Sequence, residues 1–178
     1  QHTHTGHLST GCNGKAELYL TYSRVAGIIR ASIHVRIDLM HSNLRPNLSI
    51  NSDRLWSTID RSAEIGVGKA GGLRRVALSE DDKVMRDQFV EWCESAGCNV
   101  TVDAAGNIFA RRVGRENELP PVVVGSHLDT QAAGGRFDGI LGVLSGLEIL
   151  RTLADHNITT RRSIEVVNWT NEEGARFA

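Results

Sequence analysis

Apolar residues recur at intervals of three to four positions in two stretches of the chain, and this spacing predicts two amphipathic helices. Asn51 or Ser52 would cap the first helix, and Gly66 would end it. Ser79 would cap the second helix, and Gly97 would end it. The predicted apolar faces are Leu55, Trp56, Ile59 and Ala63 in the first helix and Met85, Phe89, Trp92 and Ala96 in the second.

Shorter apolar runs later in the chain predict strands. A turn at residues 103–106 leads into a returning strand over 107–112. Residues 122–125 are a short continuous apolar run, which is typical of a central strand buried on both faces, and residues 163–169 are predicted to be another central strand. A third helix over 139–154 separates these two runs, so strand, helix and strand predict parallel pairing. The expected fold class is therefore α/β, with a mixed, largely parallel central sheet.

The beginning of the chain differs from the remainder. The first 50 residues contain five of the seven His, and five Lys or Arg against two acidic residues. Apolar and polar residues alternate over 33–39, which predicts a strand, although the sequence suggests no partner for it. We expect residues 1–43 to be an unassigned, flexible tail and the ordered domain to begin near Leu44.

Composition narrows the class of protein. The chain has 178 residues, 40% of them hydrophobic and 23% charged, which suits one globular domain. A net charge of −1 argues against a general nucleic-acid or membrane binder, and we predict partners of neither kind. The three Cys residues form no disulfide framework, so we expect free thiols and a cytoplasmic location. The chain begins with Gln1 rather than Met, and we expect it to be a fragment.

Two glycine-rich stretches could indicate phosphate binding. Residues 66–71 match the pattern G-x-G-x-x-G, but they follow a predicted helix instead of a strand, so a flexible loop is expected. The second stretch, residues 134–139, precedes the third helix, whose N-terminus could bind an anion. The charges oppose this alternative, because four acidic residues converge there with only Arg136 between them.

One His and four carboxylates are the candidate metal site: His127, Asp129, Asp138, Glu172 and Glu173. They follow strand-like runs or precede a helix, and ligands in such sheets lie beyond the carboxyl ends of strands. Imidazole and carboxylate are ligands that divalent transition metals prefer. In an extended backbone His127 and Asp129 would point the same way, so the carboxylate could hold one ring nitrogen while the other binds a metal.

Each of these residues also has a structural interpretation. His127 could be a core histidine beside a turn residue. Asp138 is well placed to cap the third helix, and it could bridge two metals only if one oxygen stays free of capping. Glu172 and Glu173 could be a solvated pair, but in an extended backbone their side chains would diverge, one toward a metal and the other toward substrate.

Together these motifs resemble the carbamoylase-type amidohydrolases of the metallopeptidase M20 clan, a group that includes N-carbamoyl-L-amino-acid hydrolases, beta-ureidopropionases and allantoate amidohydrolases. The resemblance rests on residues 125–131 (GSHLDTQ), 134–139 (GGRFDG) and 171–177 (NEEGARF). Eight residues separate Asp129 from Asp138, and dipeptidase-type relatives carry a longer insert there.

The resemblance implies a role for each site residue. His127 would bind one metal, Asp138 would bridge, Glu173 would bind the second metal, and Glu172 would be the general base with Asp129 orienting His127. It implies two divalent ions, with Zn expected and Mn, Co or Ni as alternatives. It also implies an aminopeptidase-like α/β/α sandwich, of which residues 44–178 would be the N-terminal part, and a homodimeric full-length enzyme.

The sequence therefore predicts a dinuclear metal amidohydrolase that cleaves linear C–N bonds in N-carbamoyl amino acids or ureido acids, releasing ammonia and carbon dioxide. An aminoacyl peptidase is the alternative within the same class. A metal-free binding or structural domain is the alternative outside it. This chain alone is expected to be inactive.

Overall fold

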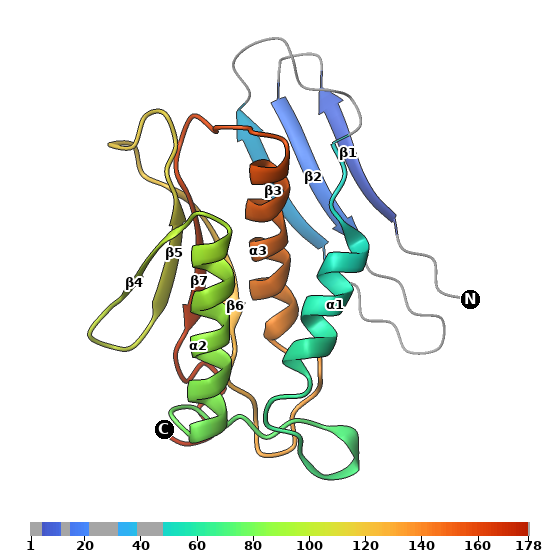
Figure 1. Ribbon diagram of the computed structural model, residues 1–178, viewed down its shortest axis with the longest axis vertical. Coiled ribbons are helices and arrows are strands. Elements are labelled where there is room, and N and C mark those ends of the chain that lie inside the picture. Colours follow the sequence, from blue (N-terminus) through green and yellow to red (C-terminus); the bar gives the residue numbers. More distant parts are fainter. Residues whose placement is uncertain (1–4, 12–14, 22–31, 39–47, 178) are drawn as a thin grey trace.

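The computed structural model describes residues 5–11, 15–21, 32–38 and 48–177, which form two sheets, three α-helices and a short 3-10 helix (Figure 1). The first sheet contains β1 (Thr5–Gly11), β2 (Lys15–Thr21) and β3 (Ser32–Asp38). The remaining elements are α1 (Ser52–Ser62), η1 (Lys69–Gly71), α2 (Glu80–Ser95), β4 (Asn99–Val102), β5 (Ile108–Arg112), β6 (Val122–His127), α3 (Ile140–Asp155) and β7 (Ile164–Trp169).

The first sheet is antiparallel, in the order β1-β2-β3. The strand predicted over residues 33–39 corresponds to β3, and its partner is β2, which the sequence did not suggest. The free thiol predicted for Cys12 lies outside the described residues. The division of the chain after residue 43 stays a prediction.

The second sheet has the order β4-β5-β7-β6 and is mixed, as predicted. The prediction that it is largely parallel is wrong for the described strands, because only β6 and β7 pair in parallel. β4 and β5 form a hairpin whose turn is closed by Asp103 Oδ1, which accepts hydrogen bonds from Ala105 and Asn107. β5 then lies antiparallel beside β7, so a hairpin supplies half of the sheet.

The positions of β6 and β7 were only partly predicted. β7 is central, between β5 and β6, as expected. β6 was also predicted to be central, but it is the edge strand among the described residues, and the side chain of Val123 points away from the core with 51% exposure. A short run of valines does not distinguish an edge strand from a central one.

All three α-helices lie on one side of the four-stranded sheet, where α2 and α3 run side by side (Figure 1). Phe89 of α2 joins the same core as Ala110 of β5 and Val166 of β7. A Cβ atom at Gly146 of α3 would lie 3.0 Å from Val166, so α3 packs closely on this face. Within the described residues there is no second helical layer, so the expected α/β/α sandwich corresponds here to two layers.

The helices begin where the sequence predicted. Asn51 Oδ1 accepts from the backbone N–H of Arg54 at 2.9 Å, and Ser79 Oγ accepts from that of Asp82 at 3.2 Å. Residues 66–71 form a loop with one 3-10 turn after a helix, which confirms that they are not a dinucleotide-binding strand–helix unit.

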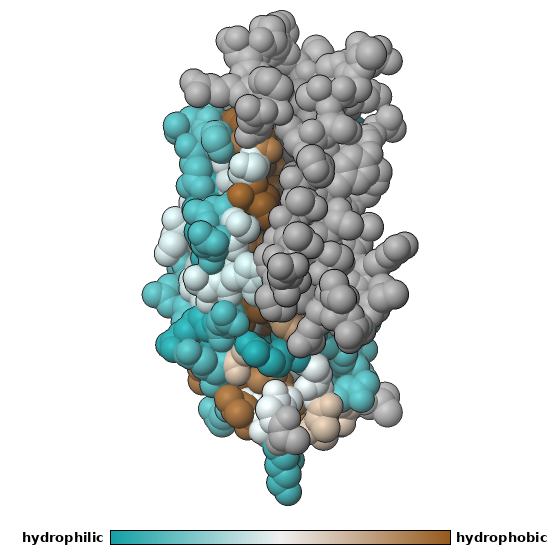
Figure 2. Space-filling view, turned by 90° about the vertical axis from the view of Figure 1, so that its right-hand side faces the viewer, coloured by the Kyte–Doolittle hydropathy of each residue, from teal (hydrophilic) through white to brown (hydrophobic). Residues whose placement is uncertain are grey.

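Figure 2 shows a mainly hydrophilic surface on the side of α1, with hydrophobic atoms exposed in separate areas. None of the described helices has the length and apolar character needed to span a membrane.

Candidate metal centre

His127 lies at the C-terminal end of β6 and is 5% exposed. Its Nδ1 lies 2.9 Å from the backbone oxygen of Asp129. Because a carbonyl oxygen can only accept, the neutral ring would donate through Nδ1, which leaves the lone pair of Nε2 for a cation. The Asp129 carboxylate was expected to hold this ring nitrogen, but its Oδ1 lies 3.7 Å away, and the backbone oxygen takes that place.

Three candidate ligands come together from separate segments. Ligand atoms of His127, Asp138 and Glu173 all lie within 4.8 Å of one another. They belong to the end of β6, the approach to α3 and the turn after β7. The fold therefore brings together the three residues that were predicted to bind metal, across 46 positions of sequence between the first and the last.

Asp138 does not cap α3. The N-cap residue is Gly139, at φ 67°, and no side chain accepts a capping hydrogen bond there. The structural interpretation of Asp138 as an N-cap is therefore wrong, and the exposed carboxylate faces the cluster instead. The backbone of Gly139 also lies directly against the imidazole of His127. A Cβ atom at this position would lie 2.3 Å from Cε1.

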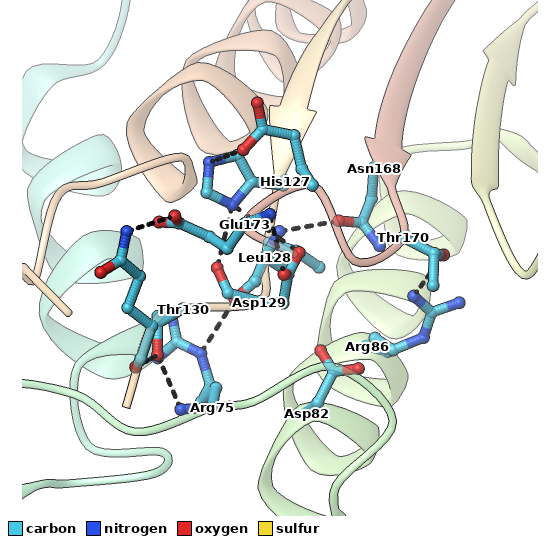
Figure 3. Close-up of polar contacts among 12 residues, drawn as sticks. Arg75, Asp82, Arg86, His127, Leu128, Asp129, Thr130, Asn168, Thr170 and Glu173 are labelled. Atoms are coloured by element: carbon cyan, nitrogen blue, oxygen red, sulfur yellow. Dashed lines mark hydrogen bonds and ion pairs between the residues drawn. The ribbon is translucent and has the colours of Figure 1, made fainter. Parts of the chain in front are cut away.

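Glu172 and Glu173 follow β7 in a turn, not in the extended backbone that was predicted. Asn171 adopts φ 59°, and both carboxylates lie near the imidazole of His127. Glu172 Oε2 lies 3.2 Å from His127 Nε2, and its side chain is 53% exposed. Glu173 Oε2 accepts from Gln131 Nε2 at 2.9 Å (Figure 3).

Asp129 lies beneath the ligands and is 3% exposed. Its Oδ2 is 3.4 Å from the backbone N–H of Glu173, which ties the turn after β7 to the end of β6. Its Oδ1 has no hydrogen-bond partner among the described residues. Asn168 is also buried, and its Oδ1 accepts from the backbone N–H of Leu128 at 2.8 Å.

Two buried charged residues, Arg75 and Asp82, lie below the site in the view of Figure 3, and the sequence analysis did not single out Arg75. The side chain of Arg75 is fully buried, and burial lowers its pKa to about 10, although the nearby charges of Asp82, Asp81 and Asp129 oppose this shift. Asp82 of α2 is 1% exposed, and burial raises the pKa of its carboxyl group. No periodic pattern marks an isolated Arg as buried, so only the tertiary structure identifies Arg75.

The cluster fits a divalent metal. It offers one imidazole nitrogen and two carboxylates within a sphere that a single cation can contact, and a third carboxylate from Glu172 lies beside the imidazole. Negative groups held this close are mutually repulsive unless a cation lies between them. The His127 tautomer leaves Nε2 available, as metal ligation requires.

Comparisons with known proteins agree with this chemistry. A family model described as Peptidase family M28 matches residues 107–177, whereas the motifs had resembled the M20 clan. The chain is 52% identical over 132 residues to an N-carbamoyl-L-amino-acid amidohydrolase of Rhizobium meliloti, covering 74% of this chain and 32% of that protein. It is 33% identical over 135 residues to a ureidoglycolate hydrolase of Arabidopsis thaliana, covering 76% and 28% respectively.

Solved structures show the same relationship. A hydantoinase/carbamoylase family amidase from Burkholderia ambifaria is 56% identical and superposes with a TM-score of 0.73, covering 74% of this chain and 32% of that one. The chain thus spans about a third of the length of its relatives.

Proposed function

Because this chain belongs to the hydantoinase/carbamoylase family of amidohydrolases, we propose that its cluster serves the hydrolysis of a linear amide C–N bond in an N-carbamoyl amino acid or ureido acid. The observation that carries the proposal is the meeting of His127, Asp138 and Glu173 within 4.8 Å, with Glu172 against the same imidazole. The activity would belong to a protein of the relatives' length, since the chain covers a third of them.

His127, Asp138 and Glu173 would hold divalent metal, with Asp138 shared between two ions and Zn as the proposed metal. A bound divalent ion supplies Lewis acidity, which polarises the carbonyl oxygen and acidifies water. Asp129 would keep His127 in its tautomer through its backbone oxygen and would hold the Glu173 turn through its carboxylate.

Glu172 would be the general base. Its carboxylate is half exposed and faces the cluster, so it can reach both water and substrate. Glu172 would accept a proton from the water that attacks the carbamoyl carbon. It would then return this proton to the nitrogen that leaves as the C–N bond breaks. The products would be an amine and carbamate, and the carbamate would decompose to ammonia and carbon dioxide.

The test uses a hybrid enzyme in which residues 48–177 replace the matching segment of the Rhizobium meliloti relative. It should release ammonia from an N-carbamoyl amino acid. Glu172→Gln should keep its metal but lower turnover by about 10²–10⁴, the usual contribution of a general base. Glu173→Gln should lose metal. The control is Glu94→Gln, an exposed change on α2, which should alter neither quantity.

Near-normal turnover in the Glu172→Gln hybrid would contradict the assignment. The same assay separates the alternatives. An aminoacyl peptidase, which the M28 match favours as the second candidate, would cleave a dipeptide and release no ammonia from the ureido acid. A metal-free binding domain would give an inactive hybrid whose metal content does not depend on His127.

A further inference from the structure

Arg75 joins the segment before α2 to the loop that carries His127 and Asp129. Its side chain has no exposed area, although arginine is rarely buried without a specific arrangement of acceptors. Nε donates to the backbone oxygen of Leu128 at 3.2 Å. Nη1 donates to the backbone oxygens of Ser62 and Ile65 at 2.9 and 3.0 Å. The guanidinium thus links the last residue of α1 and the turn after it to the residue that follows β6.

The backbone of Arg75 makes a second connection to the same loop. Its N–H donates to Thr130 Oγ1 at 2.8 Å, and its carbonyl oxygen accepts from the Thr130 N–H at 2.8 Å. Two residues earlier, Leu73 exchanges two backbone hydrogen bonds of 2.9 Å with Gly134. Residues 73–75 therefore pair with 130–134, the connection between His127 and Asp138.

The contacted residues alternate with the functional ones. Arg75 forms hydrogen bonds with Leu128 and Thr130. His127 directly precedes Leu128, and Asp129 directly precedes Thr130. These contacts hold the backbone directly after His127 and on both sides of Asp129, which limits the directions that the two side chains can take. The positive charge of Arg75 lies near Asp129 and opposes the cost of burying that carboxylate.

We propose that Arg75 is a positioning residue for the metal centre, which acts through Leu128 and Thr130 on the orientation of His127 and Asp129. This inference rests on the proposed function. Lysine could not replace Arg75, because a single ammonium group cannot reach three carbonyl oxygens in the directions that the planar guanidinium reaches them.

The test compares Arg75→Lys with Arg74→Lys in the 178-residue chain, by Co²⁺ titration followed in visible absorption and by amide hydrogen exchange without metal. The neighbouring Arg74 is exposed and is the matched control. Arg75→Lys should weaken Co²⁺ binding by roughly 10–100-fold, as expected for residues that orient metal ligands. It should also shift the Co²⁺ absorption spectrum and speed exchange at the Thr130 amide. Arg74→Lys should change none of these.

A second variant covers the case in which Arg75→Lys does not fold. Thr130→Val removes the hydroxyl that accepts from Arg75 while it keeps the shape of the side chain. It should weaken Co²⁺ binding in the same direction. Unchanged affinity, spectrum and exchange in folded Arg75→Lys or Thr130→Val would overturn the positioning role. A different result is faster exchange at Thr130 in a protein whose affinity for Co²⁺ does not depend on His127. It would support the connection between Arg75 and the loop and would contradict the proposed function.

Discussion

At the residue scale, Gly139 has the least room for a side chain in the candidate metal centre. A Cβ atom there would approach three ring atoms of His127 at 2.3–2.5 Å, and φ is 67°. Gly139→Ala should lower the free energy of unfolding by about 1–3 kcal/mol, the usual cost of placing a non-glycine residue at a left-handed position. It should also weaken metal binding, because the imidazole must move.

Gly135→Ala is the matched control for this change. A Cβ atom at Gly135 would meet only Asp138 Cβ, at an ordinary distance of 3.8 Å. Urea unfolding and Co²⁺ titration of both variants provide the measurements. Equal free energies of unfolding and equal affinities for Co²⁺ in the two variants would show that His127 is free to move away from Gly139.

Asp82 allows a prediction about pH at the same scale. Burial raises the pKa of this carboxyl group above 3.8, and Arg75, Arg86 and Asp129 are the charged groups around it. A raised folded-state pKa gives stability that is fully present below the unfolded value and is lost as pH rises through the folded value. Relative to Asp82→Asn, the wild type should therefore gain stability as pH falls from 7 toward 4.

Urea unfolding of the wild type and of Asp82→Asn at several pH values between 4 and 7 measures this difference. Asp53→Asn, an exposed change in the first turn of α1, is the control. A stability difference that grows in favour of Asp82→Asn as the solution becomes more acidic would contradict the assigned direction of the pKa shift.

At the element scale, α1 is attached to α3 through a buried carboxylate. Glu148 is 1% exposed and accepts from the Asn51 N–H and from the Nε and Nη2 atoms of Arg54, at 2.8–3.1 Å. Removing one partner of a buried pair leaves an uncompensated charge. Arg54→Ala should therefore lower the free energy of unfolding by about 3–5 kcal/mol.

Arg61→Ala on the same helix is the control. Arg61 pairs with Glu64 on the surface, where both side chains are more than half exposed, and such pairs contribute about 0–1 kcal/mol. Thermal and urea unfolding of the two variants test the contrast. Similar losses of unfolding free energy in Arg54→Ala and Arg61→Ala would mean that water reaches Glu148 when Arg54 is removed.

The sequence predicted helices better than it predicted sheet neighbours. Asn51 and Ser79 are caps whose side chains act locally, so their positions follow from a few adjacent residues. The place of β6 at the edge depends on which distant strand lies beside it, and no local pattern of valines contains that information. Arg75 was missed for the same reason, because its partners lie up to 55 positions away.

At the scale of the whole molecule, the candidate site was predictable as a set of residues but not as a geometry. His127, Asp138 and Glu173 were grouped from their motifs, and the fold brings them together. The contact of Asp129 through its backbone oxygen, and the freedom of Asp138 from capping, depend on the conformation of the connecting loops. Short motifs specify which side chains are present, whereas backbone turns determine which atoms meet.

The number of ligands limits what this chain can bind. A catalytic zinc ion usually has three protein ligands, and a second ion needs further ligands even when one carboxylate is shared. The described residues bring three ligand residues within 4.8 Å of one another. Two ions would therefore have roughly two protein ligands each, unless Glu172 left its role as base to bind metal.

We therefore predict that the 178-residue chain binds zinc weakly and at fewer than two sites. The dissociation constant should be above about 1 µM, which corresponds to a binding free energy weaker than about −8 kcal/mol. Isothermal titration with zinc measures this. His127→Ala is the control for binding elsewhere, because His2, His4 and His7 could take up metal independently. The difference between the two titrations belongs to the candidate site, where one weak site should disappear. Tight binding of two ions that depends on His127 would mean that this chain supplies a complete ligand set.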